Sequence, residues 1–231
     1  MFSAARDPTN AGLHEEETWY VSVVEQAQAG NKQAFETLFK KYTTRISSYL
    51  THMVGNEEEG RDLAQETFLK AWQSIRSLRN ESRFDTWLYR IATNTARDYL
   101  RRRKIHLSWR ENLDNEEIPS NMRIAGPEEQ VAESEHIRQA LAKVSLQYRS
   151  CLLLQLVADF SQRQIAASLN ISEKSVSVYV SRGCEQFRKA YQQLSRTSEQ
   201  QQIKERGKTN ELLEPHPLFR LGAEAFSQAF G

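Results

Sequence analysis

The segment RFDTWLYRIATNTARDYLRRRK, which runs from Arg83 to Lys104, combines aromatic rings with arginines at the spacing of a single helix. Aromatic rings can stack on unpaired bases and guanidinium groups can contact phosphates, so these residue types together can bind a nucleic acid. A helical wheel separates an apolar face from a polar and basic face. The apolar face holds Phe84, Trp87, Leu88, Ile91, Ala92 and Ala96, and the other face holds Arg90, Thr93, Asn94, Arg97 and Arg101.

The aromatic residues of this helix divide between core and surface. We expect Trp87 to pack in the core first and to contact a strand of nucleic acid second, because large aromatic side chains are mostly buried. Tyr89 and Tyr99 lie nearer the edge of the apolar face, where a ring can pack on protein and still stack on a base. A basic amphipathic helix can also bind a membrane surface, but this apolar face is needed for a core with the preceding helices. Nucleic-acid binding is therefore favoured over membrane association.

Two carboxylates on the preceding predicted helix, Asp62 and Glu66, lie four residues apart and are candidates for a nuclease or hydrolase site. No histidine or metal-ligand set accompanies them, so exposed surface charge is the favoured interpretation. Cys151 and Cys184 are too few and too far apart to predict a disulfide framework or a zinc site, and each lies in an apolar pattern typical of a core thiol. The sequence therefore predicts no catalytic residue, no metal and no cofactor.

The composition predicts an all-α protein. A chain of 231 residues with 39% hydrophobic content is long enough for one large domain or two small ones. Apolar residues recur at helical spacing, Gly and Pro are scarce, and we find no alternating strand pattern. No run approaches the roughly 18 apolar residues of a membrane-spanning helix, and the N-terminus lacks the apolar core of a signal peptide. We expect a soluble, cytoplasmic protein without membrane insertion.

The first half of the chain reads as a series of helices. The helical pattern begins at Val21, breaks at Gly30, and continues in two segments that meet between residues 43 and 44. A turn at Gly55 precedes a further helix, whose first turn carries acidic residues that suit the helix dipole. One stripe of that helix is expected to be buried, and it holds Leu63, Thr67, Phe68, Ala71, Trp72 and Ile75.

Charge is distributed unevenly, and the net charge of +1 conceals a basic domain. Residues 111–136 hold eight acidic residues, one arginine and two prolines with little periodicity, which indicates an acidic linker. Residues 137–196 hold nine Lys or Arg and three Asp or Glu, a net charge of +6. The predicted organisation is two small helical domains joined by a linker. The ranges are a tail of residues 1–20, a domain of residues 21–104, a linker of residues 105–133, a domain of residues 134–195 and an extension of residues 196–231.

The segment SQRQIAASLNISEKSVSVYVSRGCEQF in the second domain predicts a helix-turn-helix. The small side chain of Ala166 allows two helices to approach, Asn170 can adopt the left-handed turn, and Val176 and Val180 can seat the second helix on the first. Ser172 is well placed to cap that second helix. Two short helices are common in any bundle, but the local charge of +6 favours DNA contact. The residues expected at a major groove and its phosphates are Arg163, Lys174, Ser175, Ser177, Val178, Ser181 and Arg182.

The motif GRDLAQETFLKAW, followed by RFDTWLYRIATNTARDYLRRR, an acidic linker and a helix-turn-helix, resembles bacterial RNA polymerase sigma factors of the extracytoplasmic-function (ECF) type. The resemblance covers roughly Val21 to Leu194, and the paired motifs are far more specific than a helix-turn-helix alone. It implies a subunit without catalytic residues that binds core RNA polymerase, directs it to promoters and assists promoter melting. It implies no cofactor, and it makes an anti-sigma factor a possible partner.

The resemblance also implies sites. The face presented to the clamp helices of the largest polymerase subunit would hold Asp62, Gln65, Glu66 and Leu69. The minus-ten element would be opened and held by Arg79, Asn80, Ser82, Arg83, Phe84, Trp87, Asn94, Arg97 and Arg101, with rings for unstacked bases and arginines for phosphates. The linker would pass through the polymerase toward its active centre, and the C-terminal domain would contact a further polymerase subunit and the minus-thirty-five element.

Two features depart from the family pattern, and one alternative function stays open. Ser177 and Tyr179 stand where family members commonly carry Lys and Arg, and Lys174 stands where a small residue is frequent, so the minus-thirty-five sequence is not predicted. The extension after Ser195 is longer than a two-domain form requires. The alternative is a conventional helix-turn-helix regulator whose N-terminal helices sense a ligand or dimerise, and which should bind a duplex operator without core polymerase.

Overall fold

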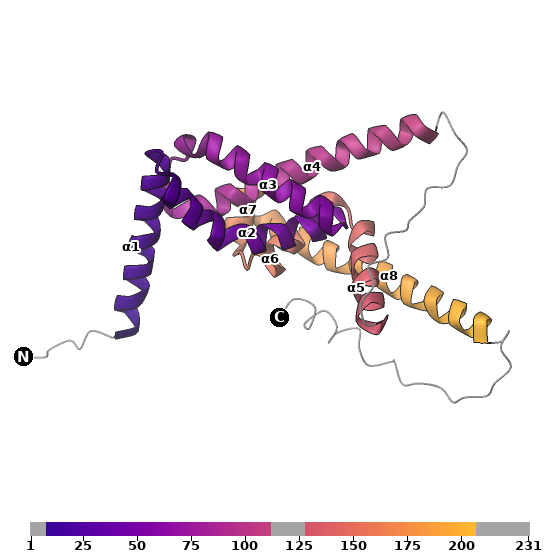
Figure 1. Ribbon diagram of the computed structural model, residues 1–231. Helices are drawn as coiled ribbons and strands as arrows, with labels where there is room; N and C mark the ends of the chain where they lie inside the picture. Colours follow the sequence, from indigo (N-terminus) through magenta and orange to yellow (C-terminus); the bar gives the residue numbers. More distant parts are fainter. Residues whose placement is uncertain (1–7, 112–127, 207–231) are drawn as a thin grey trace, which may run out of the picture.

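The computed structural model describes residues 8–111 and 128–206, with side chains placed for residues 18–105 and 133–197. All elements in these ranges are helical, which confirms the all-α prediction (Figure 1). The first group comprises α1 (Pro8–Gln28), α2 (Lys32–Val54), α3 (Glu57–Ser74), the 3-10 turns η1 (Ile75–Ser77) and η2 (Glu81–Arg83), and α4 (Phe84–Glu111). The second comprises α5 (Glu128–Lys143), α6 (Leu146–Leu156), α7 (Gln162–Leu169) and α8 (Glu173–Arg206).

The helix boundaries agree with the sequence where a local signal exists. Gly30 has a φ of 94°, and the Asn31 side chain caps α2 by accepting hydrogen bonds from the next turn, as the break at this point predicts. Gly55 ends α2 with a φ of 82°, and Asn56 caps α3. The expected boundary between residues 43 and 44 is wrong, because α2 continues through it and buries one stripe along its whole length.

Three segments predicted to lie outside the two helical domains contain helix. α1 begins at Pro8, so much of the expected N-terminal tail belongs to it. The expected linker of residues 105–133 overlaps the end of α4 and the beginning of α5, and its residues 112–127 lie outside the described part of the chain. The expected C-terminal extension begins inside α8, which runs to Arg206. Composition indicated polarity in these segments correctly, but polar helices have the same composition as polar linkers.

The first domain is built around α2, which packs against α1, α3 and α4. Its fully buried side chains include Leu38, Ile46 and Leu50 from α2. Helix α3 approaches α2 closely at Gly60, where an added Cβ would lie 2.7 Å from the backbone nitrogen of Thr51. Only a glycine permits this spacing, so α3 is held in a fixed register on α2.

The second domain contains the predicted helix-turn-helix, formed by α7 and the N-terminal part of α8. Asn170 adopts the left-handed conformation with φ 53° and ψ 51°, as expected. Ser161 and Gln164 form a reciprocal capping box at the start of α7. Ala166 and Val176 are buried between the helices. The expected turn geometry is therefore confirmed.

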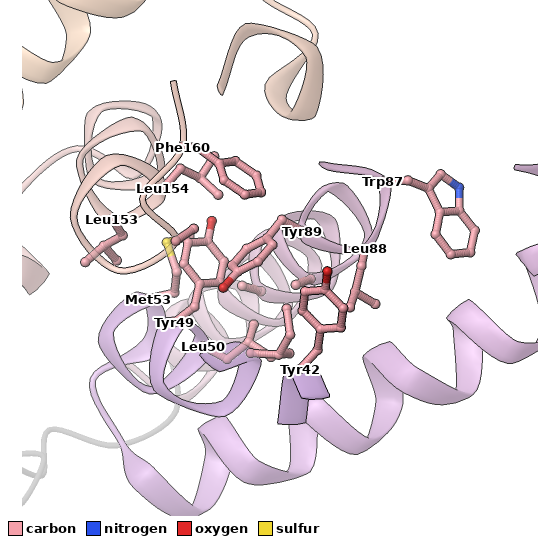
Figure 2. Close-up of a cluster of buried hydrophobic side chains, with 14 of the residues drawn as sticks. Tyr42, Tyr49, Leu50, Met53, Trp87, Leu88, Tyr89, Leu153, Leu154 and Phe160 are labelled. Atoms are coloured by element: carbon pink, nitrogen blue, oxygen red, sulfur yellow. The ribbon is translucent and has the colours of Figure 1, made fainter. Parts of the chain in front are cut away.

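The two domains pack directly on one another, because α6 lies against α2 and α7 lies against α4. Figure 2 shows Tyr49 and Met53 of the first domain beside Leu153 and Leu154 of the second. The ring of Phe160 meets the ring of Tyr89 edge-on, with centroids 4.9 Å apart. Burial of these side chains against each other gives the interface an apolar centre.

Polar contacts surround this apolar centre. The Arg149 guanidinium donates to the Met53 carbonyl of the other domain at 2.7 Å, and also to two carbonyls of its own domain, at Ala142 and Val144. The Ser168 hydroxyl donates to the Thr86 carbonyl at 3.1 Å. These bonds satisfy backbone carbonyls that the docked arrangement removes from water.

Candidate promoter-binding and polymerase-binding surfaces

The connection between α3 and α4 carries four of the residues expected at the minus-ten element. Its two apolar side chains, Ile75 and Leu78, are buried and anchor it to the domain. Its polar side chains point outward, and the exposed set comprises Arg76, Ser77, Arg79, Asn80, Ser82 and Arg83. The Asn80 side-chain oxygen Oδ1 accepts bonds from the backbone nitrogen and the hydroxyl of Ser82 at 3.1 and 2.6 Å. The connection is therefore an ordered loop with a polar outer face. We call residues 75–83 the recognition loop.

A cavity of about 380 Å³ opens beside the recognition loop. The loop lines one side, Trp87 and Arg90 of α4 line another, and Ala167 of α7 contributes from the second domain. Arg79 and Arg83 also line it, so three guanidinium groups and one indole ring surround the space. Such a lining suits a planar, anionic group such as a nucleotide.

The expected basic face of α4 is divided by the docked domain. Asn94 and Arg101 are exposed, and Arg101 forms an ion pair with Asp98 at 2.9 Å. Arg97 is only half-exposed, and its charge acts to lower the pKa values of the Tyr49 hydroxyl and the Cys151 thiol, against the larger opposing effect of burial. Arg97 therefore faces toward α6 in the docked form.

Two aromatic side chains of α4 that the family resemblance assigned to the minus-ten surface are buried, as their place on the apolar face of the helical wheel predicts. Phe84, expected at the minus-ten surface, is fully buried beside Tyr42, with ring centroids 5.7 Å apart. Its ring stabilises the core and is not available to a base. Trp87 is 7% exposed, which agrees with its expected place in the core first, although it also borders the cavity.

Two further α4 residues correct the predicted faces. Thr93, assigned to the polar face, is buried, and its hydroxyl donates to the Tyr89 carbonyl at 2.8 Å. Tyr89, expected to be available for stacking, is 1% exposed because Phe160 covers it. The wheel located Tyr89 near the edge of the apolar face, where Phe160 of the second domain covers it, and Thr93 on the polar face, where its hydroxyl meets the Tyr49 hydroxyl of α2 at 2.7 Å.

The exposed face of α3 holds the residues expected to contact polymerase. Asp62, Gln65 and Leu69 are exposed, and Leu69 is 57% exposed although it is a large apolar side chain. Glu66 forms an ion pair with Lys70 at 2.7 Å, one helical turn away. An isolated exposed leucine within a polar helix face is typical of an anchor for another protein.

Phe39 of α2 is 37% exposed although it is a large apolar side chain. Its ring packs edge-on against Phe68 of α3 at 4.7 Å between centroids. The apolar spacing of α2 includes Phe39, so periodicity gave no signal of its exposure. Together with Leu69, it adds exposed apolar surface to the α2 and α3 pair.

The helix-turn-helix presents the expected DNA-facing side chains. Arg163, Lys174, Ser177, Val178, Ser181 and Arg182 are exposed, and Ser175 is half-buried. Arg182 donates to the Tyr148 hydroxyl at 3.1 Å, and Tyr148 also packs on the ring of Tyr179. Tyr148 was missed from the sequence because it precedes the motif by a helix. It orients Arg182 at the expected phosphate-facing surface.

Other classes of site find little support in the described part of the chain. In that part, there is no helix long and apolar enough to cross a membrane. Likewise, no cluster of three or more His, Cys, Asp or Glu side chains that could hold a metal ion occurs among the described residues. Cys151 is buried and Cys184 is half-buried, and burial raises the pKa of both thiols, to about 11 for Cys151.

Comparison with known proteins identifies the two helical units. Residues 38–105 match the family model Sigma-70 region 2, and residues 134–187 match Sigma-70, region 4. The ECF RNA polymerase sigma factor SigW of Bacillus subtilis is 32% identical over 180 residues, which cover 74% of this chain and 96% of SigW. The ECF RNA polymerase sigma-E factor of Haemophilus influenzae is 39% identical over 119 residues, covering 49% of this chain and 62% of that protein.

The fold agrees with this assignment. The sigma factor RpoE of Bartonella quintana, solved with the anti-sigma factor NepR, superposes with a TM-score of 0.55 at 19% identity, covering 68% of this chain and 96% of RpoE. These features define a two-domain bacterial transcription initiation factor. The chain belongs to the ECF family of RNA polymerase sigma factors.

Proposed function

We propose that this sigma factor binds core RNA polymerase through the exposed face of α3, and reads promoter DNA with the recognition loop, α4 and the helix-turn-helix. The observation that carries the proposal is the recognition loop itself. Its apolar residues are buried while Arg79, Asn80 and Arg83 remain exposed beside an arginine-lined cavity. A base flipped from the duplex needs such a pocket, and the neighbouring phosphates need the cations.

The contact with polymerase centres on Leu69. An exposed leucine surrounded by Asp62, Gln65 and the Glu66 ion pair gives an apolar anchor with a polar rim. Interfaces commonly derive most of their affinity from a few such anchors. The C-terminal domain contacts a second polymerase subunit in this proposal, and the acidic linker leads toward the active centre.

Promoter binding requires the two domains to separate. The minus-ten and minus-thirty-five elements lie about 25 base pairs apart, or about 85 Å along B-DNA at ~3.4 Å per pair. In the docked form, Ser168 of the helix-turn-helix is hydrogen-bonded to Thr86 at the start of α4. The docked form must therefore open when the protein binds a promoter.

The proposal includes location, regulation and the absence of catalysis. The protein acts where polymerase and chromosome are, in the cytoplasm. It accelerates no chemical step of its own, because its charged residues serve binding and the polymerase supplies the chemistry. An anti-sigma factor is a fitting regulator, since RpoE of similar fold was solved with one. The conventional regulator is not favoured, because the chain matches region 2 as well as the helix-turn-helix of region 4.

The test of this function is reconstituted transcription. Purified protein, core polymerase and a library of genomic fragments are combined, and transcript starts are mapped. Starts that are absent with core alone are expected, and their upstream sequences define both promoter elements. Duplex binding without core binding and without new starts would instead identify a conventional regulator.

The polymerase surface is tested by affinity for core. Leu69→Ala is expected to weaken core binding about tenfold, an effect of about 1.4 kcal/mol. Val178→Ala is the control, because Val178 is also an exposed apolar residue but lies on the expected DNA-facing helix. Equal affinities of Leu69→Ala and wild type for core polymerase would show that the polymerase interface lies elsewhere on the protein.

A second pair of variants separates polymerase contact from helix stability. Glu66→Ala is expected to weaken core binding, whereas Glu36→Ala is not. Glu36 pairs with Lys40 at 2.8 Å, in the same one-turn arrangement as Glu66 with Lys70. Loss of an exposed one-turn ion pair has a similarly small effect on the stability of each helix. A difference between the variants therefore reports contact with the polymerase.

A further inference from the structure

The last residue of α1, Gln28, is hydrogen-bonded to the recognition loop 47 and 50 residues farther along the chain. Its side-chain amide nitrogen donates to the Leu78 carbonyl at 2.7 Å and to the Ile75 carbonyl at 3.3 Å. These carbonyls flank the 3-10 turn η1, so one amide group holds both ends of that turn. We propose that Gln28 is a positioning residue for minus-ten recognition, a role that rests on the function proposed above.

The position of the two carbonyls explains why this contact affects recognition. Leu78 immediately precedes Arg79 and Asn80, and its carbonyl orients the peptide that joins it to Arg79. Leu78 has an extended backbone, with ψ at 122°, where the chain leaves the turn. The loop lacks the repeating hydrogen bonds of a helix at this point, so a bond to one carbonyl has a large share in fixing its path.

The contact also links the loop to an element outside the matched family region. The Sigma-70 region 2 match begins at residue 38, after α1 has ended. Helix α1 packs on both η1 and η2, and Val24 and Ala27 of α1 are buried in the core. The backbone of Gln28 is therefore held by the core, and its side-chain amide fixes the recognition loop, which lines the cavity, relative to α1.

Removal of the amide donor should change selectivity more than affinity for polymerase. Gln28→Glu keeps the shape of the side chain, but at neutral pH its carboxylate repels the two carbonyls instead of donating to them. The loop then loses its fixed path, while the exposed face of α3 keeps its own anchors. We expect discrimination between minus-ten sequences to decrease about tenfold, with affinity for core polymerase unchanged within twofold.

The measurement uses holoenzyme and short single strands. Binding is compared for a non-template oligonucleotide that carries the mapped minus-ten sequence and for versions with single-base changes. Gln26→Glu is the matched control, because Gln26 lies on the same helix, is exposed, and its side chain bonds to Ser22 at 3.3 Å. Gln28→Lys, which restores a donor of similar reach, should recover part of the discrimination.

The outcomes separate positioning from stability and from the function itself. Reduced discrimination in Gln28→Glu, with core affinity and melting temperature close to those of Gln26→Glu, supports the proposal. Unchanged discrimination in Gln28→Glu overturns it. A uniform loss of affinity for every oligonucleotide together with weaker core binding also overturns it, since it marks a general structural role. Absence of discrimination in the wild-type holoenzyme would refute minus-ten recognition itself, and this inference with it.

Discussion

The guanidinium of Arg149 and the backbone carbonyl of Met53 form a 2.7 Å hydrogen bond that joins the two domains. Arg149 is 7% exposed, and burial lowers the pKa of its guanidinium to about 10, which leaves it cationic at neutral pH. Met53 is close to the end of α2, where helix carbonyls lack partners within the helix. A buried cation is thus placed at the negative end of a helix dipole.

Arg149→Ala should weaken both the interface and the second domain, because the Met53, Ala142 and Val144 carbonyls all lose their donor. Charge-assisted bonds of this kind contribute about 1.5–3 kcal/mol each, but bonds within one network are not additive, and we expect a total loss of about 2–4 kcal/mol. Thermal unfolding measures the loss, and small-angle scattering should show a larger radius of gyration as the domains separate. Arg163→Ala, at an exposed position, should leave both quantities unchanged.

Tyr89→Phe should stabilise the docked form. The Tyr89 hydroxyl is buried without a hydrogen-bond partner, and removal of an unsatisfied buried group gains about 1 kcal/mol. Tyr49→Phe should do the opposite. Thr93 has one hydroxyl proton, which it donates to the Tyr89 carbonyl, so the Tyr49 hydroxyl donates to Thr93 at 2.7 Å. Chemical denaturation of both variants is the measurement, and shifts of the same sign would contradict this account.

Cys151 should report separation of the domains. It is fully buried, and burial raises the pKa of its thiol from 9.0 to about 11, so little reactive thiolate exists at pH 8. In a Cys184→Ser background, labelling of Cys151 should be slow for the free protein and faster for Arg149→Ala. Raising the pH through about 9 should favour the open form. The Cys151 thiol ionises near pH 9 when the open form exposes it, but only near pH 11 when the docked form buries it. Equal labelling rates for the two proteins would show that the interface does not shield this thiol.

Gly60→Ala should destabilise the first domain. Alanine favours a helix by about 1 kcal/mol over glycine, but its Cβ would lie 2.7 Å from the Thr51 backbone. We expect a net loss of about 1–3 kcal/mol, because α3 must move away from α2. Gly183→Ala is the control, since its nearest contact, at 3.2 Å, leaves room for a small adjustment. An unchanged melting temperature in Gly60→Ala would show that α3 shifts without cost.

Much of the fold could be predicted from the sequence because helix caps and turns depend on residues that are close together in the chain. Asn31 and Asn56 cap helices at the predicted breaks, and Asn170 takes the left-handed turn of the helix-turn-helix. Each of these signals depends on a few neighbouring residues. The spacing of exposed polar residues likewise gave the faces that carry Leu69 and Arg182, because helix geometry alone determines which side chains share a face.

The sequence by itself determined the helical class, the two units, the family and most of the exposed residues at the proposed sites. Only the tertiary structure decided that Tyr89 and Thr93 are buried and that Gln28 holds the recognition loop. The physical reason is that helical periodicity fixes the direction of a side chain but not what lies opposite it. Phe160 covers Tyr89 from 71 residues away in the chain, and no local pattern encodes a contact between such distant segments.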